Sequence, residues 1–89
     1  MHHDETLTEH IQTPLWNLKE DSILRTFEFK GFVEAMAFVN KVAQVAETLE
    51  HHPDIAIAYN KVTLTLSTHS AGGLTQKDFD LARAIDSIA

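Results

Sequence analysis

The sequence predicts an α+β fold, a two-layer sandwich in which a four-stranded antiparallel sheet carries two long helices on one face. Three observations lead to this prediction. The elements follow the order strand, strand, helix, strand, strand, helix; the strand segments alternate apolar and polar residues; and each helix segment has an apolar stripe. Each strand–strand–helix unit is too small to bury its own part of the sheet. We therefore expect the two units to form a single domain over residues 1–89.

The first two strands are expected to form a hairpin. Residues 1–13 are a polar segment with little apolar periodicity, in which a short helix could form around Glu5–Gln12. Residues 16–18 and 24–29 alternate apolar and polar side chains, as strands with one buried face do. Residues 20–22 lie between them and are expected to form the turn.

The apolar period changes to three and four residues from Phe32 onward, which predicts an amphipathic helix. Its apolar stripe is expected to be Phe32, Met36, Val39, Ala43, Ala46 and Leu49. Three apolar residues beside this stripe are assigned to the core in preference to a subunit contact: Val33, Phe38 and Val45. Pro53 disfavours helical geometry at His52, so the helix should end near Glu50 or His51.

A second hairpin and a second helix complete the predicted fold. Residues 55–59 and 62–68 are the expected strands, with the turn at Asn60-Lys61 and with Val62, Leu64 and Leu66 on the apolar side of the second strand. After a loop with two glycines, Thr75 is the expected N-cap and Asp78 completes a capping-box pattern. The final helix has the apolar stripe Phe79, Ala82, Ile85 and Ile88.

Composition excludes several kinds of site and partner. The 89 residues contain no cysteine, so neither a disulfide framework nor a cysteine-ligated zinc site can form. The formal net charge is −6 and the seven Lys and Arg residues are scattered along the chain, which disfavours nucleic-acid binding. Charged and polar side chains interrupt the most apolar stretch, residues 32–49, so no membrane span is expected. The N-terminus does not resemble a secretory signal, and we expect a cytoplasmic protein.

The most conspicuous motif is Glu47-Thr48-Leu49-Glu50-His51-His52-Pro53, at the expected end of the first helix. If the helix keeps its pitch to His51, Glu47 lies on the same face and can orient that imidazole for acid–base chemistry. His52 then points elsewhere, because adjacent helical residues diverge by about 100°. The alternative is that the histidines only cap the helix and interact with its dipole.

His69 is the second candidate for chemistry. It ends the fourth strand on its polar side, next to the glycine-containing loop, and sites are commonly built where strands end. Because Pro53 and His69 bracket the second hairpin, this hairpin can return His69 to the neighbourhood of His51. A metal site is a further alternative, although no diagnostic ligand spacing is present among Glu47, His51, His52 and His69.

Four blocks of the sequence match a known family in order and in spacing. They are Glu47-x-x-x-His51-His52-Pro53, Tyr59-Asn60-Lys61-Val62, Leu66-Ser67-Thr68-His69 and Gly73-Leu74-Thr75-x-x-Asp78. With these blocks, the chain closely resembles the pterin-4a-carbinolamine dehydratases over about residues 14–89. The upstream Trp16 and Phe27-Glu28-Phe29-Lys30 are similar to that family as well.

The resemblance implies a hydro-lyase that converts a 4a-hydroxytetrahydropterin to quinonoid dihydropterin and water during tetrahydropterin recycling. One proton must reach the departing hydroxyl and one must leave N5, which imidazoles can achieve without a metal or an organic cofactor. By resemblance, His51 and His69 are the acid–base pair, in either order, and His52 is catalytic through positioning of the pterin. The resemblance also implies substrate-binding roles for His52, Glu47, Pro53, Thr68 and Asp78.

The resemblance has further implications for partners and for the pocket. It implies a homodimer or homotetramer, and an aromatic amino-acid hydroxylase as the functional partner. Many relatives have tryptophan and asparagine at the positions of Ile55 and Ile57, so we expect an aliphatic wall against the pterin ring. The alternative function is a non-catalytic binding module of the same fold, with a hydroxylase, a transcription factor or a molybdopterin-related protein as its partner.

Overall fold

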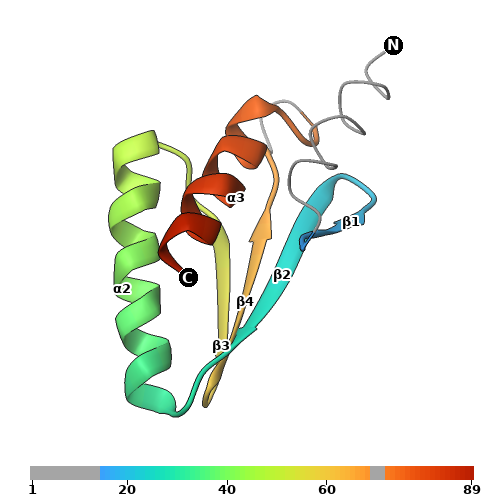
Figure 1. Cartoon of the computed structure of the whole chain (residues 1–89). Coiled ribbons are helices and arrows are strands. Elements are labelled where there is room, and N and C mark those ends of the chain that lie inside the picture. Colours follow the sequence, from blue (N-terminus) through green and yellow to red (C-terminus); the bar gives the residue numbers. More distant parts are fainter. Residues whose placement is uncertain (1–14, 69–71) are drawn as a thin grey trace.

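The computed structural model describes residues 15–68 and 72–89, which form a four-stranded antiparallel sheet with two helices on one face (Figure 1). In chain order, the elements are β1 (Asn17–Lys19), β2 (Ser22–Glu28), α2 (Phe32–Leu49), β3 (Asp54–Ala58), β4 (Lys61–Leu66) and α3 (Gln76–Ile88). The sheet order is β1-β2-β4-β3. The α+β fold is therefore confirmed, whereas the short helix expected around Glu5–Gln12 lies outside the described residues.

Two tight turns connect the paired strands. Lys19 pairs with Ser22, so the first turn is Glu20-Asp21 and Ser22 already belongs to β2. Ala58 pairs with Lys61, which places the second turn at Tyr59-Asn60, one residue earlier than predicted. Tyr59 adopts a left-handed conformation there, with φ 58°. The Asn60 side chain fixes this turn against the end of β2, since its Nδ2 donates to the Phe29 carbonyl at 2.9 Å.

The helix-facing side of the sheet supplies half of the core. Val62, Leu64 and Leu66 of β4 are fully buried, as the sequence predicts. Ile23 pairs with Leu66, and Phe27 pairs with Val62, so both residues of β2 share this buried face. The central pair of strands thus presents an apolar surface to the helices, which Arg25 of β2 interrupts.

A polar group lies on the same face, between Ile23 and Phe27. The guanidinium of Arg25 sits 4.2 Å from the centroid of the Phe27 ring and donates to Asp86 Oδ1 of α3 at 2.7 Å. The same oxygen accepts from Trp16 Nε1 at 2.8 Å. This network ties the start of the described chain to the last helix and satisfies the polar groups that the fold encloses there.

Helix α2 turns a different face toward the sheet than the pattern predicts. Its buried residues are Ala35, Phe38, Val42 and Ala46. Of the predicted stripe, Ala46 is buried and Val39 is partly buried against the core, while Phe32 is 49% exposed and Leu49 is 42% exposed. Phe38 lies on the buried face of the helix and packs against Phe27, with ring centroids 4.7 Å apart. Apolar residues spaced by three and four form two neighbouring stripes on this helix. The periodicity alone does not show which stripe faces the sheet, and the predicted stripe is mostly the exposed one.

The three apolar residues beside the predicted stripe differ in burial. Phe38 is buried and Val45 is partly buried against the core, as predicted, but Val33 is 75% exposed. The helix itself ends at Leu49, one residue before the earliest predicted position.

Helix α3 begins as predicted. Thr75 is its N-cap and forms a capping box with Asp78, whose Oδ2 accepts from the Thr75 backbone N–H at 2.9 Å. The predicted stripe is confirmed for Phe79, Ala82 and Ile85, which are buried, and Ile88 is partly buried. Leu81 is fully buried as well. Asp78 belongs to the buried residues of this helix, which brings a carboxylate into the interior beside the end of α2.

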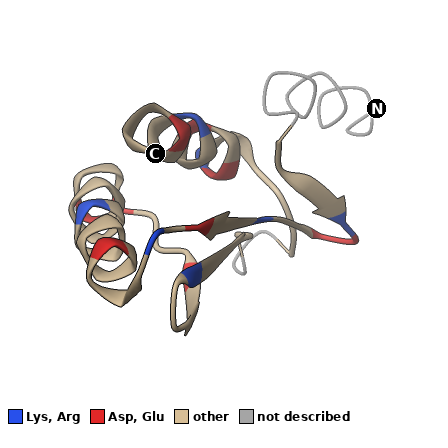
Figure 2. Ribbon diagram, turned by 60° about the horizontal axis from the view of Figure 1, so that its bottom comes forward, with Lys and Arg blue, Asp and Glu red and all other residues tan. Residues whose placement is uncertain are grey.

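Charged residues are spread over the described structure. All seven Lys and Arg residues lie in the described part of the chain, and Figure 2 shows them on both helices and on the strands rather than on one face. No helix within residues 15–68 and 72–89 is long and apolar enough to cross a membrane.

Candidate active site

The end of α2 sets the direction of the two adjacent histidines. Glu50 adopts a left-handed conformation with φ 54° directly after the helix. Its N–H donates to the Glu47 carbonyl at 3.2 Å, and the N–H of His51 donates to the Ala46 carbonyl at 3.0 Å. This pair of hydrogen bonds is the usual signature of a left-handed helix ending. The chain therefore leaves the helix before His51, and the helical spacing between Glu47 and His51 is lost.

His51 meets a buried carboxylate from the other helix. Its Nε2 lies 2.5 Å from Asp78 Oδ1. The imidazole side chain is 12% exposed, and the carboxylate is 0% exposed. The two residues are 27 positions apart in the sequence, so the packing of α3 beside the end of α2 creates this pair.

The second oxygen of Asp78 is held by two more donors. Thr68, just after β4, donates from its hydroxyl to Asp78 Oδ2 at 2.7 Å, and the backbone N–H of Thr75 donates to the same oxygen at 2.9 Å. The hydroxyls of Thr68 and Thr75 also lie 2.9 Å apart. A carboxylate with several protein donors has little freedom to rotate, so His51 faces a fixed acceptor.

His52 pairs with a different carboxylate. Its Nε2 contacts Glu47 Oε2, and both side chains are exposed, by 64% and 75% respectively. The prediction that Glu47 orients His51 is therefore wrong, because the left-handed Glu50 turns His51 toward α3 and brings His52 beside Glu47. The more general expectation, that Glu47 orients one of the histidines, agrees with this contact.

The remaining predicted site residues are placed only in part. His69 lies outside the described residues. Thr68 is fixed in its backbone, since its N–H and carbonyl both pair with Gly73 at 2.9 and 3.1 Å. Pro53 is partly buried between His52 and the start of β3. Ile55 and Ile57 of β3 stand on the helix-facing side of the sheet and are 38% and 40% exposed.

Two features of this site have no signal in the sequence pattern. The contact between His51 and Asp78 has no local pattern, and only the capping box placed Asp78 at the start of α3. Thr75 is predicted from the sequence only as a helix cap, and its hydroxyl contact with Thr68 in this site is not. Both features depend on the way α3 docks beside α2, which periodicity does not specify.

The arrangement suits proton transfer. A buried carboxylate that fixes one nitrogen of an imidazole leaves the other nitrogen oriented to accept or donate a proton. The second imidazole, on His52, is exposed and can meet a ligand. Across residues 15–68 and 72–89, no cluster of three or more histidine, cysteine or acidic side chains is placed to hold a metal ion.

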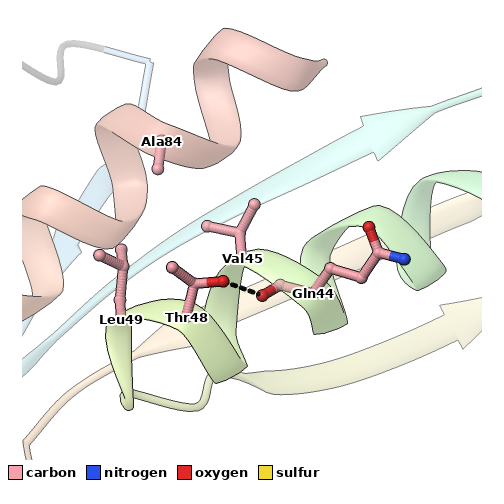
Figure 3. A pocket seen from close by; sticks show the side chains of 5 residues that line it. All are labelled: Gln44, Val45, Thr48, Leu49 and Ala84. Carbon is pink, nitrogen blue, oxygen red and sulfur yellow. Dashed lines mark hydrogen bonds between the residues drawn. The ribbon is translucent and has the colours of Figure 1, made fainter.

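A hollow of about 390 Å³ lies between α2 and α3, and neither His51 nor His52 lines it. Figure 3 shows its lining side chains: Gln44, Val45, Thr48, Leu49 and Ala84. None of these groups titrates, and the Thr48 hydroxyl is occupied by the Gln44 carbonyl at 3.0 Å. This hollow therefore has no acid–base group of its own.

The fold and the histidine–carboxylate pairs define a small two-layer α+β protein with a site suited to acid–base chemistry. The chain belongs to the pterin 4 alpha carbinolamine dehydratase family, whose model matches residues 1–88.

Curated relatives and solved structures agree with this family. A protein of Picosynechococcus sp. with the provisional name pterin-4-alpha-carbinolamine dehydratase is 57% identical over 77 residues, which cover 86% of this chain and 84% of the relative. A protein of Thermomicrobium roseum with the same provisional name is 51% identical over 87 residues, covering 97% and 94%. The crystal structure of a transcriptional coactivator/pterin dehydratase from Brucella melitensis superimposes with a TM-score of 0.91 at 38% identity, covering 97% and 94%.

A more distant structure shares the fold alone. It is a pterin dehydratase-like protein described as a RuBisCO assembly factor in the alpha-carboxysome, with a TM-score of 0.68 and 23% identity over 83% of this chain and 86% of that one.

Proposed function

We propose that the chain dehydrates a 4a-hydroxytetrahydropterin to quinonoid dihydropterin and water, in the recycling of a tetrahydropterin cofactor. The observation that carries this proposal is the His51 imidazole, which a buried carboxylate holds in a chain that belongs to the dehydratase family. The exposed His52 next to it supplies a second polar group for the substrate.

The reaction breaks the bond between C4a and its hydroxyl oxygen. The departing hydroxyl takes up one proton and leaves as water, and N5 of the pterin loses one proton, so no oxidant or reductant is required. His51 and His69 exchange these two protons, in either order, as general acid and general base. His52 positions the pterin and stabilises charge in the transition state.

The binding roles divide according to exposure. Glu47 and His52 are both exposed and can reach a ligand, so they are the proposed substrate contacts, with Pro53 holding the chain rigid beside them. Asp78 is fully buried, and Thr68 donates its hydroxyl proton to Asp78. This burial favours a supporting role for Asp78 and Thr68 over the direct substrate contact expected from the resemblance.

The test is a turnover assay on purified wild-type and variant chains with 4a-hydroxytetrahydropterin. We expect His51→Ala and His69→Ala each to lower kcat by about 100-fold or more, since one general acid or base typically contributes that much. His52→Ala should raise KM and also lower kcat, by less than the two acid–base variants, because His52 positions the pterin and stabilises charge in the transition state. Circular dichroism checks that each variant is folded. Wild-type rates in both His51→Ala and His69→Ala would overturn the proposal.

A binding module is the second candidate. It is favoured by one observation, that the similar Brucella melitensis protein is described as a transcriptional coactivator as well as a pterin dehydratase. The same assay separates the two functions when it is combined with a pterin-binding titration. Binding without turnover, or neither, supports the module, whereas turnover supports the enzyme.

A further inference from the structure

The hydrogen bonds around Asp78 fix which nitrogen of His51 carries a proton. Each threonine hydroxyl has one proton and can accept at its oxygen, whereas a backbone N–H can only donate. The Thr75 N–H therefore donates to Asp78 Oδ2, and the Thr68 hydroxyl uses its only proton on the same oxygen. The contact of 2.9 Å between the two hydroxyls then requires Thr75 to donate to Thr68.

The chain of donors thus runs in one direction, from Thr75 to Thr68 to Asp78. The Asp78 carboxylate accepts these hydrogen bonds at Oδ2, and its other oxygen, Oδ1, lies 2.5 Å from Nε2 of His51. The pair is shielded from water, because the imidazole is 12% exposed and the carboxylate 0%. Short hydrogen bonds to an ionised partner are the strong ones, so this contact can select one tautomer of the ring.

We propose that Thr75, Thr68 and Asp78 are positioning residues that hold neutral His51 as the Nε2–H tautomer and leave Nδ1 as the nitrogen that exchanges a proton with the substrate. Among residues 15–68 and 72–89, no group hydrogen-bonds to Nδ1 of His51. The tautomer follows from the hydrogen bonds alone, whereas the catalytic use of Nδ1 rests on the proposed dehydratase function.

The neighbouring pair provides a matched comparison. His52 also uses Nε2 toward a carboxylate, that of Glu47, but both groups are exposed and no further donors hold the carboxylate within the described structure. Exposed pairs exchange with water and contribute little to orientation. Removing the charge of Glu47 should therefore leave the tautomer of His51 unchanged.

Asp78→Asn is the informative substitution. The amide oxygen can accept from Thr75 and Thr68 as the carboxylate does, which directs the amide NH₂ toward His51. The ring must then accept at Nε2 and carry its proton on Nδ1, the opposite tautomer. A general base that presents a protonated nitrogen cannot accept a proton, and changes of this kind lower kcat by up to about 10⁴-fold in other enzymes.

The experiment is long-range ¹H–¹⁵N correlation NMR on chains with ¹⁵N-labelled histidine, at about pH 9, well above the ordinary pKa of an imidazole. His51→Gln assigns the signals of His51. The wild-type and Glu47→Gln chains should show the Nε2–H form of His51, and Asp78→Asn should show the Nδ1–H form. An Nδ1–H form in the wild type would overturn the proposal even if no variant folds, and so would an unchanged tautomer in folded Asp78→Asn.

Thr68 is tested by its hydroxyl alone. Thr68→Val keeps the shape of the side chain and removes one donor from Asp78, so we expect kcat to fall roughly 3- to 10-fold with KM unchanged. Thr68→Ser restores the hydroxyl and should restore the rate. An unchanged kcat in Thr68→Val, or a loss that Thr68→Ser does not restore, would overturn the role of Thr68. If the wild type has no turnover, the proposed function fails, while the tautomer is still decided by the NMR spectra.

Discussion

Two adjacent histidines each face a carboxylate through Nε2, but their surroundings differ. His51 and Asp78 form a pair inside the protein, with exposed fractions of 12% and 0%. His52 and Glu47 form a pair at the surface, with exposed fractions of 64% and 75%. The same pair of functional groups is therefore present once in a shielded setting and once in water.

The difference shows what burial adds to an ion pair. In water, a pair of this kind is screened and contributes about 0–1 kcal/mol, and its geometry is easily exchanged. In the interior, Asp78 must keep its donors, because an unsatisfied buried carboxylate is costly. The inner pair therefore has a fixed geometry suited to proton transfer, and the outer pair is free to adapt to a ligand.

The largest expected effect on folding comes from removal of the inner carboxylate. Asp78→Ala leaves the Thr68 hydroxyl, the Thr75 N–H and His51 without their acceptor and removes half of the capping box. We expect a loss of about 3 kcal/mol in the free energy of unfolding. Glu47→Ala, the matched change at the outer pair, should cost less than about 1 kcal/mol. Urea denaturation of both variants measures the difference, and equal losses would contradict the distinction between the two pairs.

A smaller effect on the free energy of unfolding is expected at Glu50, the residue between the end of α2 and the two histidines. Glu50 holds a left-handed conformation, which costs a residue with a Cβ about 1 kcal/mol relative to glycine. Glu50→Gly should therefore raise the free energy of unfolding by up to about 1 kcal/mol, although the greater freedom of glycine in the unfolded chain offsets part of this gain. Thermal unfolding measures the change. A clear loss of stability would mean that the Glu50 side chain contributes more than its backbone strain costs.

Much of the fold could be predicted from local pattern. Alternation along β4 placed Val62, Leu64 and Leu66 on the buried face, and the capping box located the start of α3. The orientation of α2 could not be predicted in this way, because apolar residues occupy two neighbouring stripes of that helix. The buried stripe is the one that includes Phe38, which packs against both Phe27 and Phe29, and these contacts depend on tertiary structure.

The site was predictable in its residues but not in its pairing. His51, His52, Glu47 and Asp78 were all candidates from the sequence, and spacing along an ideal helix paired Glu47 with His51. A single left-handed residue, Glu50, breaks that spacing, and a glutamate there gives no sequence signal of the kind that a glycine gives. The partner of His51 is Asp78 of α3, and no rule based on residues close in the sequence predicts this pairing.

The role of the buried pair in proton transfer is tested most directly by matched substitution of the two carboxylates in the turnover assay. Asp78→Asn and Glu47→Gln each replace a carboxylate by an amide of the same size, one at the inner pair and one at the outer pair. At saturating 4a-hydroxytetrahydropterin, Asp78→Asn should lower kcat by at least about 100-fold, and Glu47→Gln should change kcat by less than about 10-fold while raising KM. A kcat within about 10-fold of wild type for folded Asp78→Asn, or an equal loss in Glu47→Gln, would contradict the assignment of the buried pair to proton transfer.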